Sequence, residues 1–372
     1  MTLYAKLYSC LLLSSLLFTF SCNKKVDLLE AAKDQLNTNN YIRYTETAMY
    51  PIPESDLVDT FITQTQFLID QNDPLGYHFI QMSDRSDCIY QNDRLQVASH
   101  KDRLVRTYLP KHFENTSKFK EEVESNFRKR WSPMALLQQE WKYVADTVVN
   151  DSKLKNYSRL EGERVYEGKQ IRTEQHIFIN SSALLERFER RNYLDGSLSQ
   201  RVVIEYSNFD MTKDAEDMSY DLPKNYVSTF GKAKPVESLK EGELAPAFAG
   251  INLEGDPINN SQFAGKKVLL NFSVTTCGYC KMALDYMNQE DYVLSEDVEM
   301  LYINPEDDRS RMESYMKKIS IPYPVIASAE DIAKAYRVTS YPRFFLIDEK
   351  GKIEKIQVGY SKEFLDKLRQ KI

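Results

Sequence analysis

The chain has 372 residues and a formal net charge of −6 at pH 7; 42% of its residues are hydrophobic and 12% are aromatic. This length suits two domains, and the composition allows each of them an apolar core. The basic residues form no long run, which excludes the electrostatic footprint of a nucleic-acid-binding protein.

Residues 1–22 are predicted to be an export signal. Lys6 supplies a sparse basic region, and the apolar stretch 7–20 is too short to span a bilayer securely. The stretch ends at Ser21-Cys22, where a small residue precedes a cysteine. This pattern resembles a bacterial lipoprotein signal, which implies that Cys22 is lipidated and anchors the chain to a membrane in the periplasm or cell envelope. A plain secretory signal is the alternative, and it also predicts export.

Residues 23–231 are predicted to form a mainly-β N-terminal domain. A short amphipathic helix is expected first, and helical patterns recur at 119–131 and 133–143. Asp195-Gly196 predicts the turn of a hairpin. Strand patterns separated by turn residues occur at 41–49, 61–69, 76–82, 88–90, 95–99, 104–109, 157–166, 170–179, 184–189 and 201–209.

These elements predict a large antiparallel sheet with one face covered by helices. Their order, with a leading helix, a meander, a helical insertion and further strands, resembles the LolA/LolB-like half-barrel over residues 26–230. That resemblance implies a hydrophobic groove for a lipid, an acyl chain or a client protein. A scaffold whose aromatic side chains simply fill its core is the alternative.

The cysteines and histidines of this region form no metal site. Cys88 begins a strand pattern and is predicted to be a buried small hydrophobe; a mixed disulfide with Cys277 is the alternative. The four histidines lack the spacing of metal ligands, so no metal is predicted and surface or core positions are expected. They are His78, His100, His112 and His176.

The pattern changes after a polar segment at 232–243, which is predicted to be a linker. From Leu244 to Ile372 strands alternate with helices, which predicts an α/β sandwich with a mixed sheet. Strands are expected at 268–274, 298–304, 343–348 and 352–360, and helices at 307–319, 331–336 and after Ser361.

Cys277-Gly278-Tyr279-Cys280 lies between a buried strand pattern and a helical one. Two thiols at i and i+3 on a first helical turn can close a small disulfide ring. The helix dipole and free backbone N–H groups favour a thiolate at the first cysteine. Zinc sites also use CxxC, but neither a second CxxC nor a following histidine supplies the other ligands. The sequence therefore predicts a redox-active Cys277–Cys280 disulfide and no other cofactor.

Residues 244–372 resemble the TlpA/ResA-like thioredoxins of the AhpC/TSA–thioredoxin superfamily. The matching motifs are APAF at 245–248, GKKVLLNF before CGYC, and VTSYPRFFLID followed by GKI. The resemblance implies a thioredoxin fold and a cis Tyr341–Pro342 bond that lies against the dithiol. It also implies substrate binding by Tyr341, Pro342, Gly278 and Tyr279.

The same resemblance assigns roles to the two thiols. Cys277 is expected to be the nucleophile that attacks a substrate disulfide, and Cys280 the shielded thiol that resolves the mixed disulfide. Two positions depart from classical thioredoxins. Asn271 replaces a buried aspartate, so water or another carboxylate, with Asp285 and Glu290 as candidates, must take the proton from Cys280. Asn271 itself is expected to satisfy a core hydrogen bond.

The second departure is Thr276, which stands where those thioredoxins have a tryptophan. The Gly278-Tyr279 pair also differs from the familiar Gly-Pro, so the redox potential cannot be carried over.

The predicted function is an envelope-anchored thiol–disulfide oxidoreductase that reduces protein disulfides. Its expected partners are protein thiol or disulfide clients, an upstream membrane electron donor, and the membrane through the N-terminal lipid. A lipid- or client-binding lipoprotein with an accessory thioredoxin domain is the alternative. A thiol peroxidase ranks low because Val274 takes the threonine place of Pro-x-x-x-Thr-x-x-Cys. A cysteine hydrolase lacks a base, since no histidine follows His176.

Overall fold

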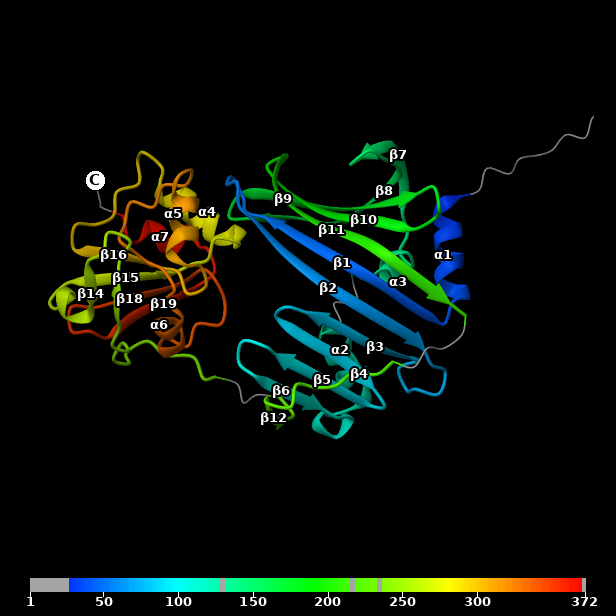
Figure 1. The fold of residues 1–372 in the computed structure, drawn as a ribbon. Helices are drawn as coiled ribbons and strands as arrows, with labels where there is room; N and C mark the ends of the chain where they lie inside the picture. Colours follow the sequence, from blue (N-terminus) through cyan, green and yellow to red (C-terminus); the bar gives the residue numbers. More distant parts are fainter. Residues whose placement is uncertain (1–26, 127–130, 214–217, 233–235, 370–372) are drawn as a thin grey trace, which may run out of the picture.

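The computed structural model describes residues 27–126, 131–213, 218–232 and 236–369. Its strands form a 12-stranded sheet, a 5-stranded sheet and a separate pair (Figure 1). The predicted signal, with Cys10 and Cys22, lies outside the described residues. Within the described ranges, no helix has both the length and the apolar character needed to cross a membrane.

The 12-stranded sheet has the order β12-β6-β5-β4-β3-β2-β1-β11-β10-β9-β8-β7, and all neighbours are antiparallel except β12 and β6. The Asp195-Gly196 hairpin joins β10 to β11, and both turn residues have the positive φ that such a turn requires. The strands are β1 (Tyr41–Pro51), β2 (Val58–Ile69), β3 (Tyr77–Ser83), β4 (Ser86–Gln91), β5 (Arg94–Ser99), β6 (Leu104–Tyr108), β7 (Lys142–Val149), β8 (Ser152–Tyr166), β9 (Lys169–Asn180), β10 (Leu185–Leu194), β11 (Ser197–Thr212) and β12 (Val227–Phe230).

The helices of this part cover one face of the sheet. They are α1 (Leu28–Thr38), η1 (Pro110–His112), α2 (Thr116–Asn126) and α3 (Pro133–Leu136). The α1 cluster includes Ile42 of β1, and the α2 cluster includes Phe67 of β2. Ile42 and Phe67 are directly opposed across the two strands, so their side chains share a face. The predicted mainly-β sheet with a helix-covered face is confirmed; the LolA/LolB-like resemblance stays a prediction.

The predicted helix at 133–143 is wrong beyond Leu136. Ser132 caps α3, and the Trp141 indole donates to the Leu136 carbonyl at 2.7 Å, which satisfies the helix end. The aromatic and β-branched residues that follow favour a strand, and they form β7 at the sheet edge. The short strand β12 was not predicted, because its parallel pairing with β6 leaves no local signal in the sequence.

The 5-stranded sheet has the order β17-β16-β15-β18-β19. The pairs β15–β16 and β16–β17 are parallel, whereas the pairs β15–β18 and β18–β19 are antiparallel. This is the mixed sheet that the sequence predicts. Its strands are β15 (Lys267–Phe272), β16 (Val298–Ile303), β17 (Val325–Ile326), β18 (Arg343–Ile347) and β19 (Ile353–Val358). The helices are α4 (Gly278–Met287), α5 (Arg309–Met316), α6 (Glu330–Ala335) and α7 (Lys362–Asp366). The small pair β13 (Ala249–Ile251) and β14 (Pro257–Asn259) precedes η3 (Asn260–Phe263) and the sheet.

Both faces of this sheet are covered. Phe344 of β18 packs with α4, α5 and α7, and its neighbour Phe345 packs with α6 on the other face. Adjacent strand residues point to opposite faces, so the near-continuous apolar run of β18 fills both layers. The result is a thioredoxin-like fold in the C-terminal region.

Part of the predicted linker packs against this second sheet. Leu239 is buried in the cluster around α6, and the Glu243 carbonyl accepts a hydrogen bond from the Ile353 amide at 2.9 Å. The division of the chain at 232–243 stays a prediction.

Candidate functional site

The two cysteines of the CGYC motif lie at the start of α4. Cys277 is the N-cap residue, with φ −92° and ψ 111°, and its Sγ accepts from the Cys280 amide at 3.1 Å. The two sulfurs are paired as a disulfide. Cys277 is partly exposed, whereas Cys280 is only 3% exposed. An amide of the first helical turn, which lacks an intrahelical partner, therefore donates to the more accessible sulfur.

The expected cis bond between Tyr341 and Pro342 is confirmed. Pro342 is buried and immediately precedes β18. In the antiparallel pairing of β15 with β18, Arg343 lies opposite Phe272, the last residue of the strand that leads to Cys277. This register brings the proline and the dithiol to the same end of the sheet. Burial, and then the nearby Glu306 carboxylate, raise the pKa of the Tyr341 hydroxyl to about 12.

Asn271 makes the predicted core hydrogen bond. It is fully buried, and its Oδ1 accepts from the Ser273 hydroxyl at 2.7 Å. The two carboxylates that the sequence suggested for proton transfer lie elsewhere. Asp285 pairs with Lys281 Nζ at 2.5 Å, and Glu290 is exposed beyond the end of α4. Among the described residues, no hydrogen bond joins either of them to Cys280.

An unforeseen carboxylate holds the loop before the dithiol. Asp307 follows β16 and is 8% exposed. Its Oδ2 accepts from the Thr275 amide at 3.2 Å and from the Thr275 hydroxyl at 2.9 Å. Asn304 Nδ2 donates to the same oxygen at 2.8 Å, and Arg311 Nε lies 2.6 Å from Oδ1. The acidic run after a buried parallel strand was the available signal, because residues that follow parallel strands gather at one sheet edge.

The tip of the β1–β2 hairpin contacts the second sheet's helices. Ile52 is 2% exposed and lies in the same apolar cluster as α4 and α5. Three acidic residues of this hairpin each pair with a basic residue of the C-terminal region. The pairs are Glu54–Lys281 at 2.7 Å, Asp56–Lys318 at 2.5 Å and Asp59–Arg311 at 2.8 Å. Figure 1 shows this end of the 12-stranded sheet directed at α4.

The β8–β9 hairpin contacts Tyr279, one of the two residues between the cysteines. The Tyr166 ring packs edge-on against the Tyr279 ring, with centroids 5.2 Å apart. The Tyr166 hydroxyl donates to the Tyr360 carbonyl at 2.5 Å, and Arg164 donates to the Tyr279 hydroxyl. The N-terminal sheet therefore forms part of the immediate surroundings of the dithiol.

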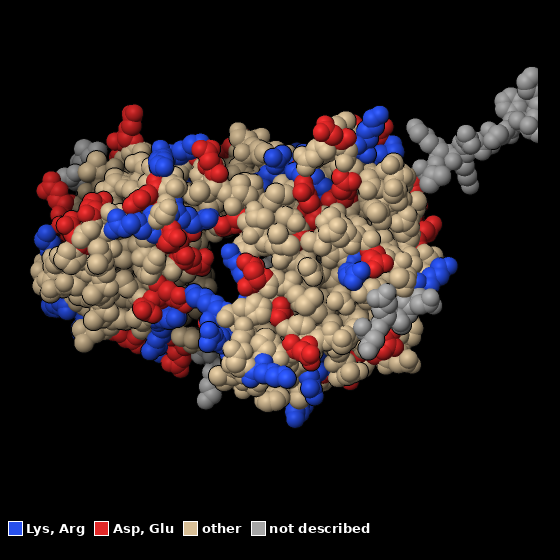
Figure 2. All heavy atoms as spheres, viewed as in Figure 1, with Lys and Arg blue, Asp and Glu red and all other residues tan. Residues whose placement is uncertain are grey.

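Two cavities between the sheets flank the dithiol turn. One of about 500 Å³ is lined by Thr276 and Glu306 and, across the gap, by Arg85. The other, of about 360 Å³, is lined by Tyr279 and Arg164 among others. Gln200 of β11 lines both cavities. Figure 2 shows a hollow between the two halves, with basic and acidic side chains on its sides.

Cys88 lies apart in the N-terminal core, as predicted. It is 7% exposed among the aromatic side chains around Phe119. Burial, together with the nearby Asp87, raises the pKa of its thiol well above the usual value. Because the thiolate is the reactive form, this environment disfavours a mixed disulfide with Cys277. Within the described residues, no group of three or more His, Cys, Asp or Glu side chains is arranged to hold a metal ion.

Comparisons with known proteins agree with this chemistry. The Redoxin family model matches residues 240–371. Thiol-disulfide oxidoreductase ResA of Bacillus subtilis (strain 168) is 34% identical over 125 residues, which cover 33% of this chain and 70% of ResA. ResA of Bacillus cereus (strain ATCC 10987 / NRS 248) is 34% identical over 150 residues, 40% of this chain and 85% of that protein. The chain belongs to the ResA-like thiol–disulfide oxidoreductases.

Membership of the ResA-like family rests on the C-terminal region, since the matched residues contain Cys277, Cys280 and Pro342. Among solved structures, a putative thiol:disulfide interchange protein DsbE from Chlorobium tepidum is 24% identical, covers 35% of this chain and 94% of its own, and has a TM-score of 0.32. A putative protein disulfide isomerase from Bacteroides thetaiotaomicron is also 24% identical, with 35% and 86% covered and a TM-score of 0.31.

Proposed function

We propose that this ResA-like protein is an exported lipoprotein that reduces disulfides in protein clients through Cys277 and Cys280. The observation that carries the proposal is the unequal exposure of the two sulfurs: Cys277 is partly exposed at the N-cap of α4, and Cys280 is buried behind it. A nucleophile must reach its substrate, whereas the resolving thiol must react only after the mixed disulfide has formed.

The reaction has two exchange steps. The Cys277 thiolate attacks one sulfur of the client disulfide; a Cys277–client S–S bond forms, the client's own S–S bond breaks, and one client thiolate leaves and takes a proton. Cys280 then attacks Cys277 Sγ, closing the Cys277–Cys280 disulfide and releasing the second client thiol. Two electrons pass to the client. An upstream dithiol donor, which we place at the membrane, must return two electrons for another turnover.

The client binds around the dithiol turn and the cis-proline. Gly278, Tyr279, Tyr341 and Pro342 form the proposed binding residues, and the backbone at Tyr341 pairs with an extended client segment. Arg164 of β8 bonds the Tyr279 hydroxyl, which supports a share of the N-terminal sheet in client binding. Under the alternative, in which that sheet binds a lipid or client and the dithiol is accessory, Cys277 would be dispensable.

The proposed location follows from the N-terminal segment. Export and attachment through a lipid on Cys22 would place the dithiol outside the cytoplasm, on the membrane that holds the donor.

Insulin reduction by the purified full chain tests the proposal. We expect the wild-type protein, with dithiothreitol as donor, to accelerate insulin precipitation, and Cys277→Ser to remove the acceleration. Cys280→Ser should accumulate a mixed disulfide on Cys277 that mass spectrometry detects. Cys88→Ser is the matched control and should behave as wild type. Activity retained by Cys277→Ser would contradict the proposal.

A further inference from the structure

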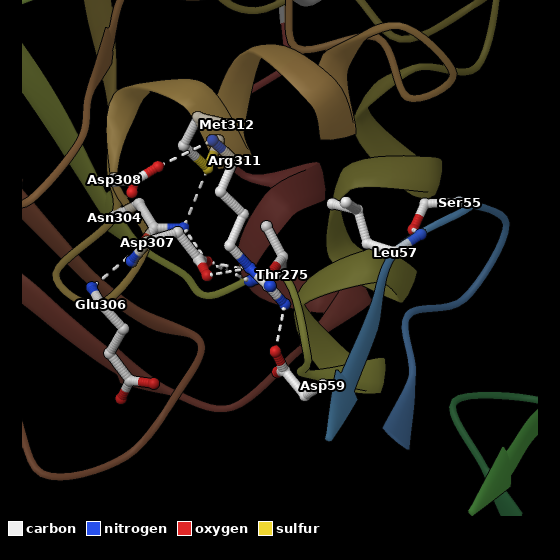
Figure 3. A network of polar contacts seen from close by, with 10 residues as sticks. All are labelled: Ser55, Leu57, Asp59, Thr275, Asn304, Glu306, Asp307, Asp308, Arg311 and Met312. Carbon is white, nitrogen blue, oxygen red and sulfur yellow. Dashed lines mark hydrogen bonds and ion pairs between the residues drawn. The ribbon is translucent and has the colours of Figure 1, made fainter. Parts of the chain in front are cut away.

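A chain of charged side chains runs from the N-terminal sheet to the loop before Cys277 (Figure 3). It begins at Asp59 in β2, whose Oδ1 lies 2.8 Å from Arg311 Nη2 in α5. Arg311 Nε lies 2.6 Å from Asp307 Oδ1. Asp307 Oδ2 in turn accepts from the amide and the hydroxyl of Thr275, two residues before the nucleophile.

The inner end of this chain is rigid. Asn304 Oδ1 accepts from the Glu306 and Asp307 amides, each at 2.9 Å, and its Nδ2 donates to Asp307. Thr275 is 1% exposed, so its two hydrogen bonds are shielded from water. Polar networks in such surroundings are electrostatically stronger than they would be in water. A displacement of Asp307 must therefore move Thr275 and the turn that follows it.

The outer end of this chain of side chains is more exposed to solvent than the inner end. The side chains of Asp59 and Arg311 are 20% and 24% exposed, and Asp59 is the member that the N-terminal sheet contributes. We propose that Asp59 is a positioning residue for the dithiol, acting through Arg311 and Asp307 on the loop that carries Cys277. This inference rests on the proposed roles of Cys277 and Cys280.

The charges of Asp59, Arg311 and Asp307 predict the direction in which each substitution changes the thiolate fraction of Cys277. Two carboxylates and one guanidinium leave a net charge of −1 beside the dithiol turn, and a nearby negative charge disfavours a thiolate. Removing the Asp59 charge brings the chain to zero and favours the Cys277 thiolate. Removing the Arg311 charge brings it to −2 and disfavours the thiolate. If these residues only held the two regions together, both losses would act in the same direction.

The remaining charges around the dithiol turn are the same in every variant. They come from β1–β2, β3–β4, β8, β10, α4 and the segment after β16, and they are Glu54, Arg85, Arg164, Arg190, Lys281, Asp285, Glu306 and Asp308. The matched control is Asp56→Asn. It breaks another ion pair between the same hairpin and the C-terminal region, Asp56–Lys318, and among the described residues no ion pair or hydrogen bond joins the Lys318 side chain to the loop before Cys277. Asp59→Glu is the conservative variant that keeps the charge.

The test measures the rate at which iodoacetamide alkylates reduced Cys277 in the full chain at pH 7, with the Cys277–Cys280 redox equilibrium against glutathione as a second readout. We expect Asp59→Asn to raise the alkylation rate about threefold and Arg311→Gln to lower it about threefold, the order expected for one unit charge in a partly screened environment. The equilibrium should shift toward the dithiol in Asp59→Asn and toward the disulfide in Arg311→Gln. Asp56→Asn and Asp59→Glu should match the wild type.

Equal effects of Asp56→Asn and Asp59→Asn, or shifts of Asp59→Asn and Arg311→Gln in one direction, would overturn the positioning role. Asp59 lies near the surface, so its variants should keep the wild-type thermal unfolding temperature and stay informative if Arg311→Gln is poorly folded. The proposed function can fail independently of this inference. If the wild-type chain leaves insulin unreduced but Cys277 alkylation still changes in opposite directions in Asp59→Asn and Arg311→Gln, the reductase function is contradicted and the positioning role is supported.

Discussion

The two sheets are built by different connections. In the 12-stranded sheet nearly every strand pairs with its neighbour in sequence, and only β1–β11 and β12–β6 join distant segments. The 5-stranded sheet instead places β15, the strand before the dithiol, between β16 and β18, so that loops from separate segments meet at one end. Hairpin connections extend one broad antiparallel sheet, whereas crossover connections bring the ends of several strands together at one edge, where a functional site can form. The chemistry therefore belongs to the C-terminal region, and the N-terminal sheet affects it where its hairpins make contact.

The largest expected effect comes from Cys277→Ser. Disulfide reduction should fall to the rate without protein, because no other described thiol is placed to start the exchange. The N-terminal sheet should be untouched. Both tryptophans, Trp131 and Trp141, belong to that part of the chain, so their fluorescence reports its unfolding alone. A shift of the tryptophan fluorescence transition in Cys277→Ser would contradict the separation between the N-terminal sheet and the region that carries the chemistry.

Two core truncations, one in each sheet, test whether the two sheets unfold independently. Phe188 in the first sheet and Phe345 in the second are both 0% exposed, and each truncation to alanine should cost about 3–5 kcal/mol. Trp131 packs on Phe188, so Phe188→Ala should shift the fluorescence transition while the redox equilibrium stays as in the wild type. Phe345→Ala should do the reverse. Identical responses to the two variants would mean that the sheets unfold as one unit.

Acid should weaken the first sheet through Glu189, which is 3% exposed. Burial alone would raise the pKa of its carboxyl, but Arg191 and Arg187 outweigh burial and hold the pKa below its ordinary value of 4.5. A lowered pKa stabilises the fold above pH 4.5, and this stability is lost as pH falls through the folded-state value.

Glu189→Gln should therefore reduce the free energy of unfolding on the order of 3 kcal/mol at pH 7, since it removes the buried carboxylate that pairs with Arg187 and Arg191, and only Arg187 keeps a second carboxylate partner. The difference from wild type should shrink below pH 4.5, as followed by tryptophan fluorescence in urea. A difference that is constant from pH 7 to pH 3 would show that the charge of Glu189 is not its cause.

The smallest expected effect is at the contact between the regions. Tyr166→Phe removes the hydroxyl that donates to the Tyr360 carbonyl and keeps the ring against Tyr279, so it should cost about 1 kcal/mol. We expect the fluorescence transition and the transition seen by far-ultraviolet circular dichroism to move further apart in urea. Transitions that stay equally spaced would mean that this hydrogen bond does not couple the sheets.

The sequence predicted features with a local cause. Alternation along the strands, the Asp195-Gly196 turn and the capping serine at 361 all act within a few residues, and the structure contains each of them. The dithiol was found because its motif is short, and the cis-proline was expected from the resemblance to the TlpA/ResA-like thioredoxins. Strand β7 was missed because the segment starts with a true helix, α3, that ends where Trp141 bonds back to it.

The contacts that join the regions could not be predicted in the same way. Asp59 lies in β2 of the first sheet and Arg311 in α5 beside the second, and nothing near either residue in the sequence marks its partner. Asp307 could be placed at the correct edge of the second sheet, but its hydrogen bonds to Thr275 depend on the three-dimensional course of two loops.

The redox state of Cys277 and Cys280 inside growing cells tests the central claim most directly. Rapid acid quenching, alkylation of free thiols and mass spectrometry of the full-length protein would measure it. A reductase of protein disulfides must be kept reduced by its donor, so we expect both cysteines to be mostly thiol. A pair that is mostly disulfide would contradict the proposed direction of electron flow and indicate an oxidant.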